Sequence, residues 1–334
     1  MKRTKQTGLS VEEQPAEPSL DESNTGQESK EQCAVPPEQE APTPQPQPWH
    51  TFLKDADDKD IKQRFSTEAN KILLHHLGID NNYCVLGIMD RKDLINTWDL
   101  DQIYDSIKVL NPLCQKDVLL ILYSRGGDIE AGYQISKLCK LFSKNKFAVA
   151  VPRQAKSAAT LIAIGADEIH MGLLGQLGPI DPQLGNLPAL GVSQALQTIA
   201  SLSERFPNSS DMFSKYLHMA LTVEQIGYYE RISESAVQYA ERLLSTKSHL
   251  PKVPSLIARE LVYEYKDHGF VIDIDEATQH LGTNWILTRT REVSASEEIY
   301  SLLTFINIWL GIHNRNQRIL VSGDYTDGIY LWNA

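Results

Sequence analysis

Residues 118–128 of the chain read VLLILYSRGGD. The run over 118–123 is apolar throughout, without alternation, which indicates a strand buried on both of its faces. Two glycines follow almost at once, and glycine permits the positive φ values that a sharp turn after a strand requires. Apolar residues at helical spacing then fill 129–142. The stretch therefore predicts a buried strand, a glycine turn and a helix in succession.

The same alternation extends to both sides of this stretch. We predict further strands over 84–89, 147–151 and 168–171, and helices over 60–77, 99–110 and 158–165. Strands that alternate with helices of this length are joined by right-handed crossovers into a largely parallel sheet, so the predicted fold class is α/β. Beyond Gly191 the pattern becomes mainly helical, with helices predicted over 194–205, 222–245, 254–265 and 298–310 and short strands over 269–274, 319–321 and 329–332.

Composition divides the chain into three parts. Residues 1–50 contain eight of the sixteen prolines and four basic against nine acidic residues, with Gln, Glu and Ser making up much of the rest. Such a segment buries too little apolar surface to offset its ordering entropy, so we predict a disordered acidic tail rich in Pro and Gln. We assign residues 51–290 to the main domain, and residues 291–334 to a C-terminal helix with a short β extension.

Charge and cysteine content exclude several classes of function. The net charge is −11, and no basic stripe of the kind that binds nucleic acid is present. No apolar run reaches the length of a membrane span, and no apolar core of a signal peptide follows Met1, so we expect a cytoplasmic protein without a transmembrane segment. The four cysteines form no CxxC pair. We therefore expect free thiols, no metal site and no cofactor.

Three segments that follow predicted strands or lie near them carry residues suited to chemistry. The first is the glycine turn of residues 124–127, whose backbone N–H groups can point at a carbonyl oxygen. The second, residues 156–160, reads KSAAT and places Ser157 at the entrance of a helix, although serine there is also an ordinary helix N-cap. The third is the turn-rich loop of residues 177–183. Open α/β sheets bind ligands at the carboxyl ends of their strands.

The order of these segments resembles the Clp/crotonase superfamily, and most of all the serine dehydrogenase proteinase family. The residues that carry the resemblance lie in 119–132, 156–172 and 177–183, and it extends more loosely to residue 285. The resemblance implies a Clp/crotonase-like fold with repeated ββα units and a mainly parallel sheet, followed by a helical C-terminal part. It also implies a serine peptidase that acts on peptides or unfolded protein segments, and a homo-oligomer.

The resemblance assigns roles to individual residues. Ser157 matches the nucleophile, Gly126 or Gly127 matches the glycine of the oxyanion hole, and Ala158 matches its second donor. Arg125 stands where the superfamily usually has proline, and Lys156 stands where alanine is common. We expect both side chains, together with Asp181, to contact substrate.

The general base is the least defined part of the predicted site. Clp-type proteases place a histidine in the loop that resembles residues 180–183, and this chain has Asp181 there. Signal peptide peptidase A enzymes use a lysine instead, and Lys215 is the best match. Its apolar neighbours favour a desolvated amine of lowered pKa, whereas a solvated lysine on an amphipathic helix is equally compatible with the pattern. His268 lies in a segment that the family shares, and the sequence gives it no role.

These observations lead to one main hypothesis and two alternatives. The main one is a Ser-Lys peptidase that works through an acyl-enzyme on Ser157; the chain has no G-x-x-x-x-G-K-[ST] loop, so it does not itself hydrolyse ATP. The alternatives are a catalytically silent oligomeric scaffold with the same fold, and a crotonase-type acyl-CoA enzyme, which uses the same oxyanion geometry.

Overall fold

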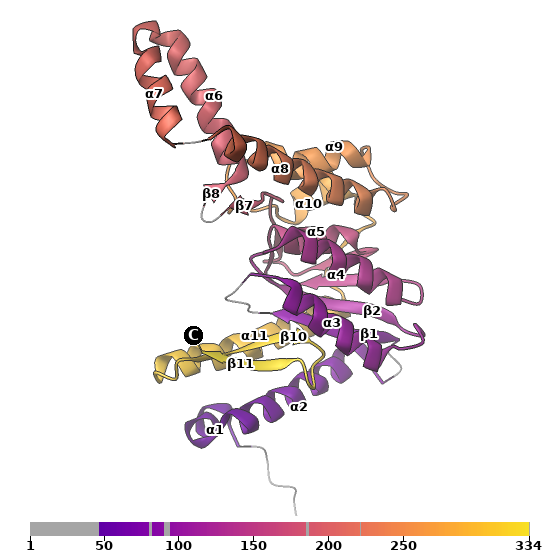
Figure 1. The fold of residues 1–334 in the computed structure, drawn as a ribbon. Helices are drawn as coiled ribbons and strands as arrows, with labels where there is room; N and C mark the ends of the chain where they lie inside the picture. Colours follow the sequence, from indigo (N-terminus) through magenta and orange to yellow (C-terminus); the bar gives the residue numbers. More distant parts are fainter. Residues whose placement is uncertain (1–46, 80–81, 90–93, 185–186, 221, 334) are drawn as a thin grey trace, which may run out of the picture. The chain divides into compact units, whose positions relative to one another are not determined.

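The computed structural model describes residues 47–333 apart from 80–81, 90–93, 185–186 and 221. From Gln47 onward the chain forms one compact unit. Nearly all of the tail predicted over residues 1–50 lies outside the described residues. The elements, shown in Figure 1, are α1 (Trp49–Asp55), α2 (Asp58–Leu77), β1 (Tyr83–Met89), α3 (Thr97–Leu110), β2 (Asp117–Tyr123), α4 (Ile129–Phe142), β3 (Phe147–Val151), β4 (Gln154–Ala155), α5 (Ala158–Gly165), β5 (Glu168–Met171), β6 (Gln176–Leu177), β7 (Gln183–Leu184), β8 (Leu187–Pro188), α6 (Ala189–Arg205), η1 (Pro207–Ser209), α7 (Ser210–Ala220), α8 (Val223–Leu244), α9 (Pro254–Arg259), η2 (Glu260–Glu264), α10 (Ile274–Leu281), β9 (Ile286–Leu287), α11 (Arg291–Ile312), β10 (Gln317–Gly323) and β11 (Ile329–Asn333).

Seven strands form the main sheet of the described chain, in the order β11-β10-β1-β2-β3-β5-β9. The five strands from β1 to β9 are parallel to one another, as the alternation of strands and helices predicts. Helices α3, α4 and α5 lie against one face of this sheet, and α2 and α11 lie against the other (Figure 1). The fold is thus α/β with a mainly parallel sheet.

Strand β2 is apolar at successive positions because both of its faces are buried. Val118, Leu120 and Leu122 pack into the core on the side of α3, α4 and α5. Leu119 and Ile121 point the other way, into the core that α2 and α11 close. Because successive side chains of a strand alternate between faces, a sheet covered on both sides requires apolar residues at every position.

The C-terminal segment adds two strands, β10 and β11, to the same sheet, and its helix α11 packs against them. Strand β10 runs antiparallel to β1, with Gly323 opposite Gly87, and β11 pairs with β10. Helix α11 is fixed to β10 through the buried Asn307 side chain, whose Oδ1 accepts from Ile319 N–H at 2.7 Å and whose Nδ2 donates to Ile319 C=O at 2.9 Å. The short C-terminal β extension that the sequence predicts is therefore an integral edge of the sheet.

One predicted element is wrong. Residues 269–274 were expected to form a short strand, but only Ile272 makes a β-bridge there, with Leu177. The carboxylate of Asp273 accepts a hydrogen bond from the Glu276 amide at 3.0 Å and thereby begins helix α10. An N-cap aspartate thus outweighs the short apolar run before it.

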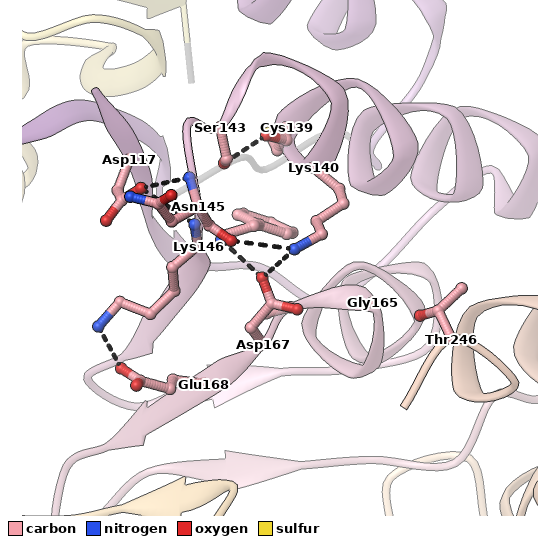
Figure 2. Close-up of polar contacts among 12 residues, drawn as sticks. Asp117, Cys139, Lys140, Ser143, Asn145, Lys146, Gly165, Asp167, Glu168 and Thr246 are labelled. Atoms are coloured by element: carbon pink, nitrogen blue, oxygen red, sulfur yellow. Dashed lines mark hydrogen bonds and ion pairs between the residues drawn. The ribbon is translucent and has the colours of Figure 1, made fainter. Parts of the chain in front are cut away.

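A polar cluster ties several elements together where β3 and β5 begin (Figure 2). The Asp167 carboxylate accepts from Lys140 Nζ at 2.6 Å, from the Phe147 amide at 2.8 Å and from Lys247 Nζ at 3.1 Å. The buried Lys247 also donates to the Gly165 carbonyl at 2.8 Å. The cluster thereby joins α4, β3 and the end of α5 to the segment that follows α8, at the amino ends of the parallel strands.

Candidate active site

Ser157 occupies a strained turn between β4 and α5. Its backbone has φ 51° and ψ −117°, a combination that residues other than glycine rarely adopt. Its hydroxyl makes no capping hydrogen bond to the helix that it precedes. The ordinary N-cap role, which the sequence left open, is therefore not the one seen. A serine on a sharp strand-to-helix turn is the arrangement that nucleophilic serines adopt in α/β hydrolases.

The glycine turn after β2 lies directly against this serine. Gly126 has φ 106°, and a Cβ atom built on it would lie 2.6 Å from Ser157 Cβ and 2.5 Å from the Lys156 carbonyl oxygen. Gly127 has φ 151°, and a Cβ there would collide with the backbone of Ile95. Both positions thus require glycine. The structure thus places the glycine turn and the serine in contact.

Some of the backbone amides around Ser157 already donate a hydrogen bond within the protein, and others do not. Gly126 N–H donates to Ser124 Oγ at 3.1 Å. Among the described residues, the hydrogen bonds of the turn and of α5 use neither the Gly127 N–H nor the Ala158 N–H. These two donors, one from the glycine turn and one from the start of the helix, are thus left for a ligand oxygen.

Lys156 contacts the protein backbone, whereas the sequence predicts a contact with substrate. Its side chain is buried, and its Nζ donates to the carbonyl oxygens of Leu177 at 3.2 Å, Gly269 at 3.4 Å and Phe270 at 2.6 Å. Burial lowers the pKa of this amine, while the charge of Asp267 acts in the opposite direction. The side chain therefore connects two loops instead of facing solvent beside the serine.

Those two loops bring Asp181 and His268 together. Leu177 and Ile272 exchange backbone hydrogen bonds of 2.9 and 3.1 Å, which aligns the loop after β6 with the segment before α10. On these loops, His268 Nδ1 lies 3.7 Å from Oδ2 of the buried Asp181. The sequence patterns predict no role for His268 and only a substrate contact for Asp181. A signal was present nonetheless: an aspartate stands where Clp-type enzymes have histidine, and a histidine lies in the later shared segment.

Lys215 and Arg125 are the remaining predicted site residues. Lys215 lies on α7, where its side chain is 73% exposed and its Nζ pairs with Asp211 at 2.7 Å. The desolvated surroundings expected of a lysine base are missing, because Met212 and Tyr216 on the same helix also face outward. Figure 1 shows α7 well away from α5, at the far end of the α6–α7 hairpin. Arg125, by contrast, is exposed beside the glycine turn.

Metal-ligand clusters and apolar helices are two further features to consider in the described part of the chain. Among those residues, no group of three or more His, Cys, Asp or Glu side chains is arranged to hold a metal ion. In the same residues, no helix combines the length and the apolar character that crossing a membrane requires.

The fold is α/β with a mainly parallel sheet, and Ser157 lies on the turn that enters α5. Residues 57–204 match the family model of the ClpP-like SDH-type serine proteinases, the family that the sequence motifs resemble. Two curated relatives are uncharacterized proteins of Methanocaldococcus jannaschii. MJ0137 is 33% identical over 134 residues, which are 37% of this chain and 46% of that protein. MJ1495 is 41% identical over 76 residues, which are 23% of this chain and 26% of that protein. The matches thus span less than half the length of either relative.

Several solved structures are similar in fold. Two are mutants of the 1510-N membrane-bound stomatin-specific protease, both 15% identical with a TM-score of 0.40. The alignment with the first covers 74% of this chain and 94% of that one, and the alignment with the second, a complex with a substrate peptide, covers 76% and 89%. ClpP1 from Listeria monocytogenes is 14% identical with a TM-score of 0.38, and its alignment covers 67% of this chain and 98% of that one.

Proposed function

We propose that this protein is a serine peptidase in which Ser157 is the nucleophile and His268, oriented by Asp181, is the general base. One observation carries the proposal: Ser157, which has φ 51° and makes no capping hydrogen bond, lies against the glycine turn. The preceding residue, Lys156, donates hydrogen bonds to the loops that contain Asp181 and His268. The family match over residues 57–204 supports the same class of enzyme.

The proposed reaction uses these groups in the following steps. Ser157 Oγ attacks the carbonyl carbon of a peptide bond while its proton passes to His268. The carbonyl oxygen becomes an oxyanion, which the N–H groups of Gly127 and Ala158 stabilise. The C–N bond then breaks, His268 returns the proton to the leaving amine, and water releases the acyl group from Ser157 by the same steps.

Asp181 has the chemistry of an orienting carboxylate. It is buried, and its Oδ2 faces the imidazole Nδ1 at 3.7 Å, which leaves the other ring nitrogen for the serine proton. The separation exceeds a hydrogen bond by several tenths of an ångström, and catalytic hydrogen bonds are commonly longer before substrate binds. Ser157 itself is only 4% exposed. We therefore expect substrate to enter as an extended segment that reaches a recessed hydroxyl.

Single-residue variants test the nucleophile and decide between the two bases. Hydrolysis of denatured casein and of fluorogenic peptides, without ATP, is measured for the wild type and for Ser157→Ala, His268→Ala and Lys215→Ala. We expect the first two variants to lose at least about 1,000-fold in kcat/KM, the order of magnitude seen when a triad residue is removed, and Lys215→Ala to stay within about twofold. The exposed His218 on α7, changed to alanine, serves as the matched histidine control.

Each other outcome has a defined meaning. Full activity of Ser157→Ala overturns the proposal, as does a wild type that neither hydrolyses these substrates nor reacts with a fluorophosphonate probe; the latter result instead favours the silent scaffold. Loss of activity in Lys215→Ala with retention in His268→Ala returns the role of base to the lysine. Hydrolysis of acyl-CoA thioesters but not of peptides identifies the crotonase-type alternative.

A further inference from the structure

Lys156 is a buried cation that makes no hydrogen bond to a carboxylate among the described residues. Its three acceptors are all backbone carbonyl oxygens, those of Leu177, Gly269 and Phe270. Three acceptors match the three hydrogens of an ammonium group, whereas a neutral amine has two hydrogens and would turn its lone pair towards an oxygen. Charge-assisted hydrogen bonds of this kind are stronger than neutral ones. The side chain is therefore suited to holding backbone segments in place.

The segments held in this way carry the two other members of the proposed site. Leu177 begins the loop that leads to Asp181, and Gly269 directly follows His268. Lys156 in turn directly precedes Ser157. A single side chain thus connects the backbone next to the nucleophile with the two loops that supply the base and its orienting carboxylate.

Further contacts fix the same junction. A Cβ atom on Gly178 would overlap Lys156 Cδ, so the lysine stem lies flat against the Gly178 backbone. Thr160 on α5 has its Oγ1 at 2.8 Å from the Gly178 carbonyl oxygen and 3.1 Å from the Gly178 amide. The loop that contains Asp181 is therefore attached to α5 through Thr160 and to the residue before Ser157 through the Lys156 side chain.

We propose that Lys156 is a positioning residue, whose ammonium group sets the Asp181–His268 pair relative to Ser157 by holding both loops through their carbonyl oxygens. This inference rests on the peptidase function proposed above. It assigns Lys156 no contact with substrate and no proton transfer, because its Nζ hydrogens are directed at the protein backbone. Displacement of catalytic groups by about 1 Å lowers rates by about 100-fold, which sets the expected effect of removing the ammonium.

The test compares Lys156→Met, which retains the length of the stem, with Lys156→Arg, which retains the charge. We expect Lys156→Met to lower kcat for peptide hydrolysis by about 100-fold with little change in KM, and Lys156→Arg to recover about 10-fold of that loss. Lys247→Met is the matched control. It also removes a buried ammonium bonded to a backbone carbonyl, but in the Asp167 cluster at the amino ends of the strands. This variant should therefore lower thermal stability and leave kcat within about threefold.

Two further readouts separate positioning from a general loss of stability. Hydrogen exchange should increase in Lys156→Met over 177–181 and 267–272 and remain unchanged over 118–123. The alkaline limb of the kcat profile should lie at higher pH in Lys156→Arg than in the wild type, because burial lowers the pKa of the lysine and a guanidinium stays protonated.

The two proposals fail in different ways. If Ser157→Ala and His268→Ala are inactive but Lys156→Met keeps its kcat within about threefold, the positioning role is wrong and the peptidase stands. If Ser157→Ala remains active, the peptidase proposal is wrong, and faster exchange of both loops in Lys156→Met then shows a purely structural clamp. Unchanged exchange in both loops overturns the clamp itself.

Discussion

Replacement of Gly126 by alanine tests the contact on which the proposed site depends. A side chain at φ 106° adopts backbone geometry that costs about 1–3 kcal/mol. Its Cβ would also lie 2.6 Å from Ser157 Cβ and 2.5 Å from the Lys156 carbonyl oxygen, and overpacking of this kind costs about 1–3 kcal/mol more. We therefore expect a loss of about 4 kcal/mol, or a melting temperature lower by about 10 °C in a domain of this size.

The surviving folded protein should also be inactive, since relief of the overlap moves the turn away from the serine. Gly227→Ala provides the control, because Gly227 lies exposed in helix α8 with no atom within 4 Å of a built Cβ. The same substitution there should stabilise the protein by about 0.5–1 kcal/mol. Thermal unfolding followed by circular dichroism and peptide hydrolysis measure both effects. A Gly126→Ala variant that melts like the wild type and retains its kcat refutes the described contact.

Three other predictions concern the rest of the fold. Burial alone would raise the pKa of Asp167, but hydrogen bonds from two lysines and a backbone amide lower this pKa below 3.8. Asp167→Asn should therefore destabilise the protein at neutral pH. In urea unfolding the difference from the wild type should shrink as the pH falls below 3.8, and a constant difference would contradict the reasoning. Burial raises the pKa of Cys84 to about 12 and also raises that of Cys139, so iodoacetamide followed by peptide mapping should modify the partly exposed Cys114 well before either. Asn307→Leu leaves two buried backbone groups of β10 unpaired and should cost about 3 kcal/mol by urea unfolding, and a loss below about 1 kcal/mol would show that the side chain does not join α11 to the sheet.

Local patterns predicted the parallel part of the sheet well. The predicted bounds of α4, β3, α5 and β5 coincide with those of the structure. These elements are fully or largely apolar, and glycine, proline or a capping aspartate separates them, so each one is determined by its own residues. The glycine turn and the serine could be expected to meet because they follow neighbouring strands of a parallel sheet, where the ends of β2 and β3 share an edge.

Contacts between distant segments could not be predicted in the same way. Asp181 and His268 meet because the backbone of Leu177 pairs with that of Ile272, and no periodicity encodes such a bridge. Lys215 shows the opposite case: apolar neighbours in the sequence suggested burial, but Met212 and Tyr216 are exposed on α7 together with the lysine. Lys156 has an ordinary sequence context, and only the carbonyl oxygens around its Nζ reveal what it contacts.

The position of α11 and β10 in the sheet has a consequence for how the protein is made. Leu119, Ile121, Ala148 and Ala150 on the central strands are synthesised well over a hundred residues before the helix that shields them. During translation this apolar surface and the unpaired edge of β1 stay exposed until residues 291–323 leave the ribosome. Completion of the sheet and its second core is therefore a late event, and nascent chains stalled before that point should bind chaperones.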